Sequence, residues 1–365
     1  MLQQNFTTIK RKIIFMFNFI LNWATPYQII SFIVLLAVGV FFLVKFCDIF
    51  VDSASSIAKR LKISPLVIGL TIVAMGTSCP ELAVSVSDSI STLASGGNAN
   101  VAMGNVVGSN ICNILLVLGL SALFTPMIVR KTIVKKELPI LLGVSCLLVI
   151  FGCFFGLNGK HAIVRWEAII FVILMIAYLV YVVLSAKKDA KAEGNEAQGE
   201  EIVIKDMPLW KSIILCVIGI TGIILGGEMV VFGAKGLATE GALAIGLNAD
   251  LTEALVGLTI VAVGTSLPEL VTSVIAAKKG ENELAIGNVV GSNIFNILFI
   301  LGIAGTVNPL TTGSQIVIDL LVMLGVTLLL FVLSLKGKLG KMQGAILLAC
   351  YVGYLAYLIT RTIIA

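Results

Sequence analysis

The sequence predicts an all-α integral membrane protein in which ten transmembrane helices form two five-helix repeats of inverted topology. The first observation is composition: of 365 residues, 58% are hydrophobic and only 12% are charged, and the mean hydropathy is +1.08. A soluble chain carries about a quarter charged residues, so this one lacks the charge to cover its surface in water. A soluble enzyme, a nucleic-acid-binding protein and a disulfide-stapled secreted domain are thereby excluded.

Ten long apolar stretches are the second observation. Each has roughly the 20 residues that a spanning helix needs, and none shows the alternation of a transmembrane barrel strand. The predicted spans are 29–50, 65–92, 101–124, 138–157, 163–185, 209–234, 248–277, 283–305, 314–335 and 341–363.

Polar segments divide the chain into parts. Residues 1–28 form an N-terminal extension with a basic cluster at 10–12, which we interpret as an interfacial helix. Residues 186–208 are rich in charge, Gly, Gln and Asn, as a flexible cytoplasmic linker is. The linker separates a first five-helix repeat, 29–185, from a second, 209–365.

The distribution of basic residues predicts the orientation. With the N-terminus outside, sixteen Lys and Arg fall in inside loops and seven in outside segments. Basic loops mark the cytoplasmic side, so both termini are expected outside, although the basic cluster at 10–12 argues the other way. We expect a multi-pass protein of the cell (inner) membrane, with the lipid bilayer as its surroundings.

The third observation is an internal repeat. Residues 69–86, GLTIVAMGTSCPELAVSV, match 257–274, GLTIVAVGTSLPELVTSV, at fourteen of eighteen positions. Residues 104–119, GNVVGSNICNILLVLG, match 287–302, GNVVGSNIFNILFILG, at thirteen of sixteen. Because five spans separate the copies, the halves enter the membrane in opposite senses. Such inverted repeats build many secondary transporters, whose sites lie at the midplane between the copies.

Each repeat places one carboxylate deep in apolar sequence, Glu81 in the first and Glu269 in the second. An ionisable group there costs roughly 2.5–3.5 kcal/mol on insertion scales, and it persists where it faces a cavity, a partner or an ion. No Lys or Arg lies near either glutamate within its span. Pro80 and Pro268 cannot complete the helical hydrogen bonds, so we expect a kink beside each glutamate.

Oxygen-bearing side chains surround both glutamates. Helical spacing puts them on shared faces, and the candidate metal ligands are Ala74, Thr77, Ser78, Glu81, Ser109, Asn113, Ala262, Thr265, Ser266, Glu269, Ser292 and Asn296. These residues offer oxygen and neither sulfur nor imidazole, which suits Ca²⁺ and Na⁺. With a single histidine and seven scattered cysteines, a zinc site is not expected.

The charge of the two glutamates limits the kinds of ion transport that this site can serve. The negative charge of two ionised glutamates is balanced by one divalent ion or by two to three monovalent ions. A site that binds either kind of ion in turn is typical of an antiporter. A Ca²⁺/H⁺ antiporter using the same glutamates stays open, as does a cation channel or binding protein. The sequence contains neither a paired nucleophile and base nor a cofactor-binding loop, so nothing in it indicates an enzyme.

The motifs GTSCPE with GNVVGSNICN, and GTSLPE with GNVVGSNIFN, strongly resemble the alpha repeats of the sodium/calcium exchanger family, in its prokaryotic form. This resemblance implies exchange of Ca²⁺ for Na⁺ by alternating access, with the first and sixth spans sliding across a fixed core. It also implies that the twelve candidate residues hold the ions, Ala74 and Ala262 through their carbonyls. Some relatives carry Asp where this chain has Asn296, which argues against K⁺ co-transport. No cofactor, nucleic acid or obligate protein partner is expected.

Overall fold

The computed structural model describes residues 25–61, 63–94, 101–157, 160–192, 207–244 and 262–364. Eight helices in these ranges are long and apolar enough to cross a membrane, and a bent pair, Pro65–Thr77 with Cys79–Ala94, supplies a ninth. The seventh predicted span, 248–277, is described only from Ala262 onward. The predicted class, a multi-pass helical membrane protein, is confirmed.

The first half begins with one long helix and continues through a broken span. π-Helical segments, labelled η, interrupt several of its helices. Its elements are α2 (Thr25–Leu61), α3 (Pro65–Ile68), η2 (Gly69–Val73), α4 (Ala74–Thr77), α5 (Cys79–Ala94), α6 (Val101–Cys112), η3 (Asn113–Leu118), α7 (Gly119–Phe124), β1 (Met127–Ile128), η4 (Ile133–Glu137), α8 (Leu138–Phe154), β2 (Gly156–Leu157), β3 (Lys160–Ile163) and α9 (Arg165–Ala192).

The second half has the same succession of long helices as far as it is described, with η7 in the place of η3 and β4 in the place of β1. Its elements are α10 (Leu209–Ala244), α12 (Ala262–Thr265), α13 (Leu267–Lys278), α14 (Asn282–Phe295), η7 (Asn296–Ile300), α15 (Leu301–Val307), β4 (Leu310–Thr311), α16 (Ser314–Ser334), β5 (Lys338–Leu339) and α17 (Lys341–Ile364).

Local chemistry explains where the inner helices start. Pro65 opens α3 after an extended Ser64, because its ring already holds the helical φ angle. Asp88 of α5 accepts hydrogen bonds from the Val101 and Ala102 amides, both 3.1 Å long, and so caps α6. The turn before α14 contains Gly280, whose φ of 82° favours glycine.

Most predicted span boundaries agree with the helices to within a few residues, but three helices, α2, α9 and α10, continue well past their predicted ends. Helix α10 reaches Ala244, ten residues beyond the predicted end at 234. The third predicted span, 101–124, has the bounds observed. Helix α2 continues past the predicted end at 50, because Asp48 and Asp52 lie 3.0 and 2.7 Å from the Lys279 ammonium and need not end the helix. Helix α9 extends to Ala192, into the predicted linker. Residues 193–206 and the N-terminal extension up to residue 24 lie outside the described residues.

Short strands, which the sequence analysis did not predict, join the two halves at their loops. Met127 and Ile128 of β1 pair with Leu339 and Lys338 of β5. In the other ladder, β3 pairs with both β2 and β4, and its partners in β4 are Leu310 and Thr311. Strands β1 and β4 follow equivalent helices in the two repeats, so each half contributes the same strand to a ladder with the other half.

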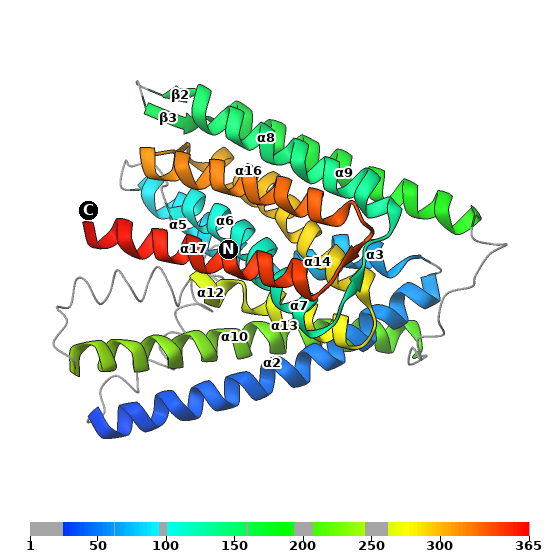
Figure 1. Cartoon of the computed structure of the whole chain (residues 1–365), viewed down its shortest axis with the longest axis horizontal. Coiled ribbons are helices and arrows are strands. Elements are labelled where there is room, and N and C mark those ends of the chain that lie inside the picture. The colour runs from blue at the N-terminus through cyan, green and yellow to red at the C-terminus, as the bar shows by residue number, and fades with distance from the viewer. Residues whose placement is uncertain are drawn as a thin grey trace.

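The helices differ in how much of their surface is buried, so the bundle has central and outer helices. The spans Val101–Phe124 and Asn282–Val307 are the most enclosed, with 78% and 94% of their apolar windows buried, against 17% for α2. Helices α2 and α10 lie side by side along one face of the bundle (Figure 1). Apolar side chains on outer helices, such as Phe41 and Val217, are more than half exposed, as expected of a surface that faces lipid.

The central helix α14 approaches η2 closely because glycines line the contact. A Cβ atom on Gly69 would lie 2.8 Å from the Leu284 carbonyl oxygen. A Cβ atom on Gly291 would lie 2.7 Å from both the Cα and the carbonyl oxygen of Leu70. Small residues bring membrane helices to such separations, and here they bring the repeat motifs of the two halves together.

We predict that Gly291→Ala destabilises the protein by about 1–3 kcal/mol, the usual cost of overpacking, because backbone at Leu70 cannot move aside. The measurement is the apparent melting temperature of the purified protein in detergent. Gly325→Ala in α16 is the matched control, because nothing lies within 4 Å of its added Cβ. Equal melting temperatures for the two variants would contradict this account of the contact.

Candidate cation-binding site

The two repeat glutamates lie at equivalent breaks in their helices. Ser78 separates α4 from α5 with φ and ψ of −85° and 9°, and Ser266 separates α12 from α13 with −88° and 5°. A proline follows each break two residues later and removes an amide donor. The first broken span bends by 49°. A helix break is therefore present in both copies, three residues before each glutamate, and the first copy shows the predicted kink.

Glu81 and Glu269 are fully buried, and hydroxyl groups hold one oxygen of each. The Ser109 hydroxyl donates to Glu81 Oε1 at 3.3 Å. Across the repeats, the Ser78 hydroxyl donates to Glu269 Oε1 at 2.9 Å. Thr265 of the second half is in turn a hydrogen-bonding neighbour of the Glu81 carboxyl group. Each half thus completes the surroundings of the other half's carboxylate.

Neither glutamate forms an ion pair within the described ranges. The ion pairs found there join Arg130, Lys279 and Arg361 to other acids, namely Glu283, Asp48, Asp52 and Asp319. The second oxygen of each site carboxylate, Glu81 Oε2 and Glu269 Oε2, is buried without a hydrogen-bond partner. Burial of an uncompensated carboxylate is strongly unfavourable, so these two oxygens are suited to a cation.

Two asparagines lie at equivalent positions of the repeats, each four residues after a serine of the predicted site, Ser109 or Ser292. Asn113 begins the π-helical segment η3 and Asn296 begins η7; π-helical turns are frequent at functional sites. Both side chains are fully buried. The Asn113 amide nitrogen donates to Asn293 Oδ1 and the Asn296 amide nitrogen to Asn110 Oδ1, each at 3.0 Å. Their own Oδ1 atoms are buried without a partner.

Five buried oxygens of the predicted residues consequently lack a partner: Glu81 Oε2, Glu269 Oε2, Asn113 Oδ1, Asn296 Oδ1 and Ser266 Oγ. Two carboxylates with neutral amide and hydroxyl oxygens are the ligand chemistry of hard cations. The described residues contain no group of three or more His, Cys, Asp or Glu able to hold a metal. A cation here would rely on neutral oxygens as much as on charge.

The remaining predicted residues lie around this set. The Thr77 hydroxyl lies 3.1 Å from Asn288 Oδ1, 3.1 Å from the Val73 carbonyl oxygen and 3.4 Å from Ser292 Oγ. The Ala74 carbonyl accepts the Ser78 amide at 3.0 Å and the Ser292 hydroxyl at 3.5 Å. Of Ala262, the structure describes only the backbone, as the first residue of α12.

A second ring of polar residues was missed by the sequence analysis. Asn105 donates to the Glu81 carbonyl oxygen and to Ser85 Oγ. Asn288 repeats this with the Glu269 carbonyl oxygen and Ser273. Asn110 and Asn293 accept the amide hydrogen bonds of Asn296 and Asn113. Every one of these residues is identical in the two repeats, and that identity was the signal that could have found them.

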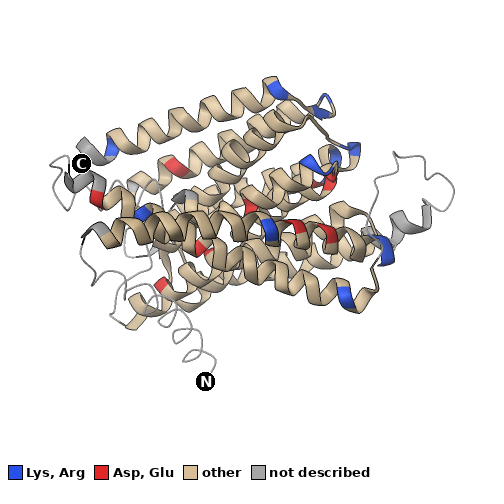
Figure 2. Ribbon diagram, turned by 90° about the horizontal axis from the view of Figure 1, so that it is seen from below, with Lys and Arg blue, Asp and Glu red and all other residues tan. Residues whose placement is uncertain are grey.

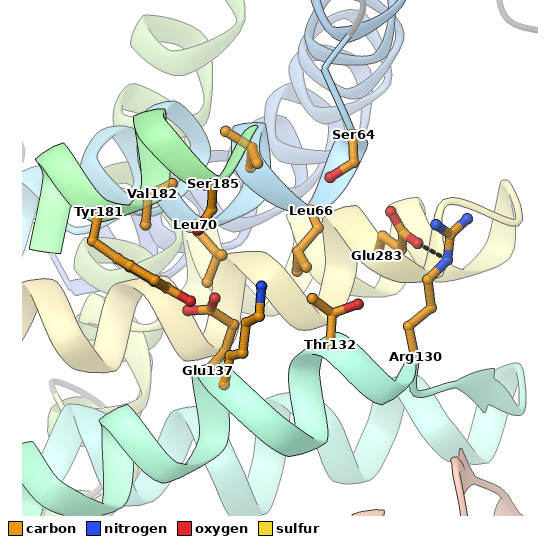
Figure 3. A pocket seen from close by; sticks show the side chains of 12 residues that line it. Ser64, Leu66, Leu70, Arg130, Thr132, Glu137, Tyr181, Val182, Ser185 and Glu283 are labelled. Atoms are coloured by element: carbon orange, nitrogen blue, oxygen red, sulfur yellow. Dashed lines mark ion pairs between the residues drawn. The ribbon is translucent and has the colours of Figure 1, made fainter. Parts of the chain in front are cut away.

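One pocket among the described residues lies away from the two glutamates. A cavity of about 220 Å³ opens between α3, η4, α9 and α14 (Figure 3). Acidic and basic side chains line it together, among them Lys136, Glu137 and the ion pair of Arg130 with Glu283. It contains none of the twelve predicted residues, most of which are buried between the repeats instead.

Comparisons with known proteins agree with this arrangement. The family described as sodium/calcium exchanger protein matches residues 31–184 and 211–360, one segment in each half. CaxA of Alkalimonas amylolytica is 38% identical over 322 residues, which cover 87% of this chain and 95% of that protein. The sodium/calcium exchanger MaX1 of Methanosarcina acetivorans is 34% identical over 351 residues, covering 90% and 98%.

The fold is also similar to solved structures. A structure of the sodium-calcium exchanger NCX_Mj, soaked with zero Na⁺ and Ca²⁺, superposes with a TM-score of 0.72 at 32% identity, covering 90% of this chain and 99% of that one. The family matches both halves of the chain, and these relatives align with it over nearly their whole length. The similarity therefore covers most of the chain. The chain belongs to the sodium/calcium exchanger family, a family of membrane antiporters for cations and not of enzymes.

Proposed function

We propose that this protein exchanges Ca²⁺ for Na⁺ across the membrane as a secondary antiporter, using the oxygen cluster between the repeats as its single alternating site. The observation that carries the proposal is the pair of buried carboxylates, Glu81 and Glu269, each with one oxygen lacking a hydrogen-bond partner. Equivalent residues of both halves build the cluster, so it can face either side when the halves exchange conformations.

The charge of the site supports coupled exchange. Two ionised glutamates carry about two negative charges, which one Ca²⁺ neutralises, or two to three Na⁺ ions. An empty site would leave both carboxylates uncompensated in a buried position, which is strongly unfavourable. Movement of the loaded site is thus favoured over movement of the empty one, and this preference is what couples the two ion flows.

We assign the ion ligands to the twelve residues predicted from the sequence. Glu81 and Glu269 bind Ca²⁺ directly and also contact Na⁺. Side-chain oxygens of Asn113, Asn296 and Ser266 face the cargo, since they lack other partners. Hydroxyl groups and carbonyls complete the set, namely those of Ala74, Thr77, Ser78, Ser109, Ala262, Thr265 and Ser292.

The α2–α10 pair is proposed to slide across the rest of the bundle. Glycines line the surface between the two helices: a Cβ on Gly226 would lie 3.0 Å from the Gly39 carbonyl oxygen. Polar contacts of α2 with α13 and the turn after it include Cys47 Sγ with Thr272 Oγ1 at 3.3 Å and the Lys279 ion pairs. Two helices that approach each other this closely along one face of the bundle suit a unit that moves as one body.

The charge distribution supports the predicted orientation. Most described Lys and Arg lie at one end of the bundle (Figure 2). We assign that end to the cytoplasm, which places both termini outside and residues 186–208 inside, between the repeats 29–185 and 209–365, with residues 1–28 as an extension. The inner membrane protein YrbG of Escherichia coli is 35% identical over 284 residues, in keeping with an inner-membrane location.

Ca²⁺/H⁺ exchange is a second candidate, because one observation favours it as well. A buried carboxylate oxygen without a partner accepts a proton as readily as a metal ion, and both glutamates have one. The same site and the same movement would serve either coupling ion. The dependence of Ca²⁺ flux on Na⁺ decides between them.

Removing either carboxylate charge is expected to abolish transport. Glu81→Gln and Glu269→Gln should each reduce Ca²⁺ uptake by reconstituted vesicles to the level of protein-free vesicles, because one charge cannot balance Ca²⁺. The matched control is Glu167→Gln, another buried glutamate, whose Oε2 accepts the Val164 amide at 2.8 Å and which lies outside the site; it should transport normally. Full uptake by either site variant would refute the assignment.

The coupling ion is tested with ion gradients. Vesicles loaded with Na⁺ and diluted into Na⁺-free K⁺ or choline medium should take up Ca²⁺, and vesicles without the Na⁺ gradient should not. Uptake driven by an outward proton gradient and indifferent to Na⁺ would retain the site and replace the coupling ion. Flux without any counter-ion would indicate a channel instead.

Asn296→Asp is expected to change the preference among monovalent cations. The substitution adds a charge to the site while keeping an oxygen at the same position, and K⁺-dependent relatives carry Asp there. Ca²⁺ uptake in Na⁺, K⁺ and Li⁺ gradients measures the effect. Unchanged selectivity would mean that the side chain at position 296 contributes little to monovalent ion binding.

A further inference from the structure

Asn110 and Asn293 form a crossed pair of amides at the contact between the two central helices. Each is about 1% exposed, and the two occupy equivalent positions in the repeats. The Asn110 amide nitrogen donates to the Asn293 backbone carbonyl at 3.4 Å, and the Asn293 amide nitrogen donates to the Asn110 carbonyl at 3.2 Å. The two hydrogen bonds link α6 to α14 reciprocally.

These backbone contacts determine which way every amide in the network points. A backbone carbonyl only accepts hydrogen bonds, so the ends of Asn110 and Asn293 that face the carbonyls are the NH₂ groups. Their Oδ1 atoms therefore point the other way, Asn110 Oδ1 to Asn296 and Asn293 Oδ1 to Asn113. Those oxygens also only accept, so Asn296 and Asn113 must present their own NH₂ groups to them.

The consequence is that Asn113 and Asn296 turn their Oδ1 atoms away from the network, where both are buried without a partner. A free asparagine side chain would rotate to satisfy its oxygen, because an unpaired buried acceptor is unfavourable. Here, rotation of the Asn113 or Asn296 amide would place its oxygen against the Oδ1 atom of Asn293 or Asn110, with no hydrogen between the two oxygens. The network holds two acceptors ready for a ligand at the contact between the halves.

We infer that Asn110 and Asn293 are positioning residues that orient the Asn113 and Asn296 oxygens toward the transported cation and thereby determine the affinity of the site for Ca²⁺. The inference rests on the proposed function. Neither residue contacts the cargo itself, since both of their polar groups are engaged in the network. They act on the ion through the two asparagines, as the residues behind metal ligands do elsewhere.

The same geometry makes position 296 selective for an amide. An aspartate there would set a carboxylate oxygen against Asn110 Oδ1, with no hydrogen between them. Asn110 cannot turn its NH₂ group to the aspartate without losing its bond to the Asn293 carbonyl. Asn110 and the residue at 296 should therefore be energetically coupled.

The experiment measures Ca²⁺ binding to purified full-length protein by isothermal titration calorimetry. Asn110→Leu and Asn293→Leu keep the volume and remove the amides, and each should raise the Kd for Ca²⁺ about 10–100-fold, the usual effect of losing a residue that orients a metal ligand. The matched control is Asn308→Leu, a buried asparagine that bonds Thr92 Oγ1 at 3.0 Å outside the site; its Kd should be unchanged. Should Asn110→Leu fail to fold, Asn110→Ala makes the same comparison.

A double-mutant cycle separates positioning from a merely structural role. The loss of affinity caused by Asn296→Asp should be smaller in the Asn110→Leu background, because the opposing oxygen is gone, and the same in the Asn308→Leu background. Wild-type Kd in Asn110→Leu, or strictly additive effects, would overturn the inference. Wild-type protein that binds no Ca²⁺ would instead overturn the proposed function, so the two failures are distinguishable.

Discussion

The burial of two carboxylates between the repeats is the constraint on which the rest of the structure depends. A charged side chain at the centre of a membrane is unfavourable by several kcal/mol when nothing compensates it. Glu81 and Glu269 lie where no described basic residue reaches them, and hydroxyl groups satisfy only half of their oxygens. The helix breaks place hydroxyl groups on these two carboxylates, and the buried asparagines at the π-helical turns add further neutral oxygens between the repeats. A fold that surrounds charge with neutral oxygen is stable when a cation completes it.

The exchange of partners between halves makes the site a joint property of both repeats. Ser78 of the first half contacts the carboxylate of the second, and Asn113 is held by Asn293. Glycines at the contact between η2 and α14 bring these groups within hydrogen-bonding distance. A single repeat could not produce this arrangement, because the polar groups of each half form hydrogen bonds with those of the other half. Symmetry here is therefore a requirement of the chemistry and not only a trace of duplication.

The sequence was sufficient to predict the class, most spans, the repeat and the two glutamates, because those features are local: composition, run length and an ionisable residue in an apolar segment. It also predicted the kink of the first repeat, since proline acts on its own helix. It did not predict the amide network of Asn110 and Asn293, because hydrogen bonds between residues 183 positions apart have no local pattern. Helix α2 exceeded its predicted end for a similar reason, as Lys279 from the other half holds its acids. The strands were missed because segments of two residues carry no periodicity.

The strand ladders bear on how such a chain originated. Residues 127 and 310 are equivalent positions of the two repeats, and each opens a strand that pairs with a loop of the opposite half. The partners, at 339 and 163, both precede the last helix of their half by the same interval. Two identical five-helix proteins, inserted in opposite directions, would form these ladders with each other without any change of register. Fusion of two such genes would preserve an existing dimer interface, and the covalent connection would then free each copy to diverge, as Asp88 in one half and Ala276 in the other have done.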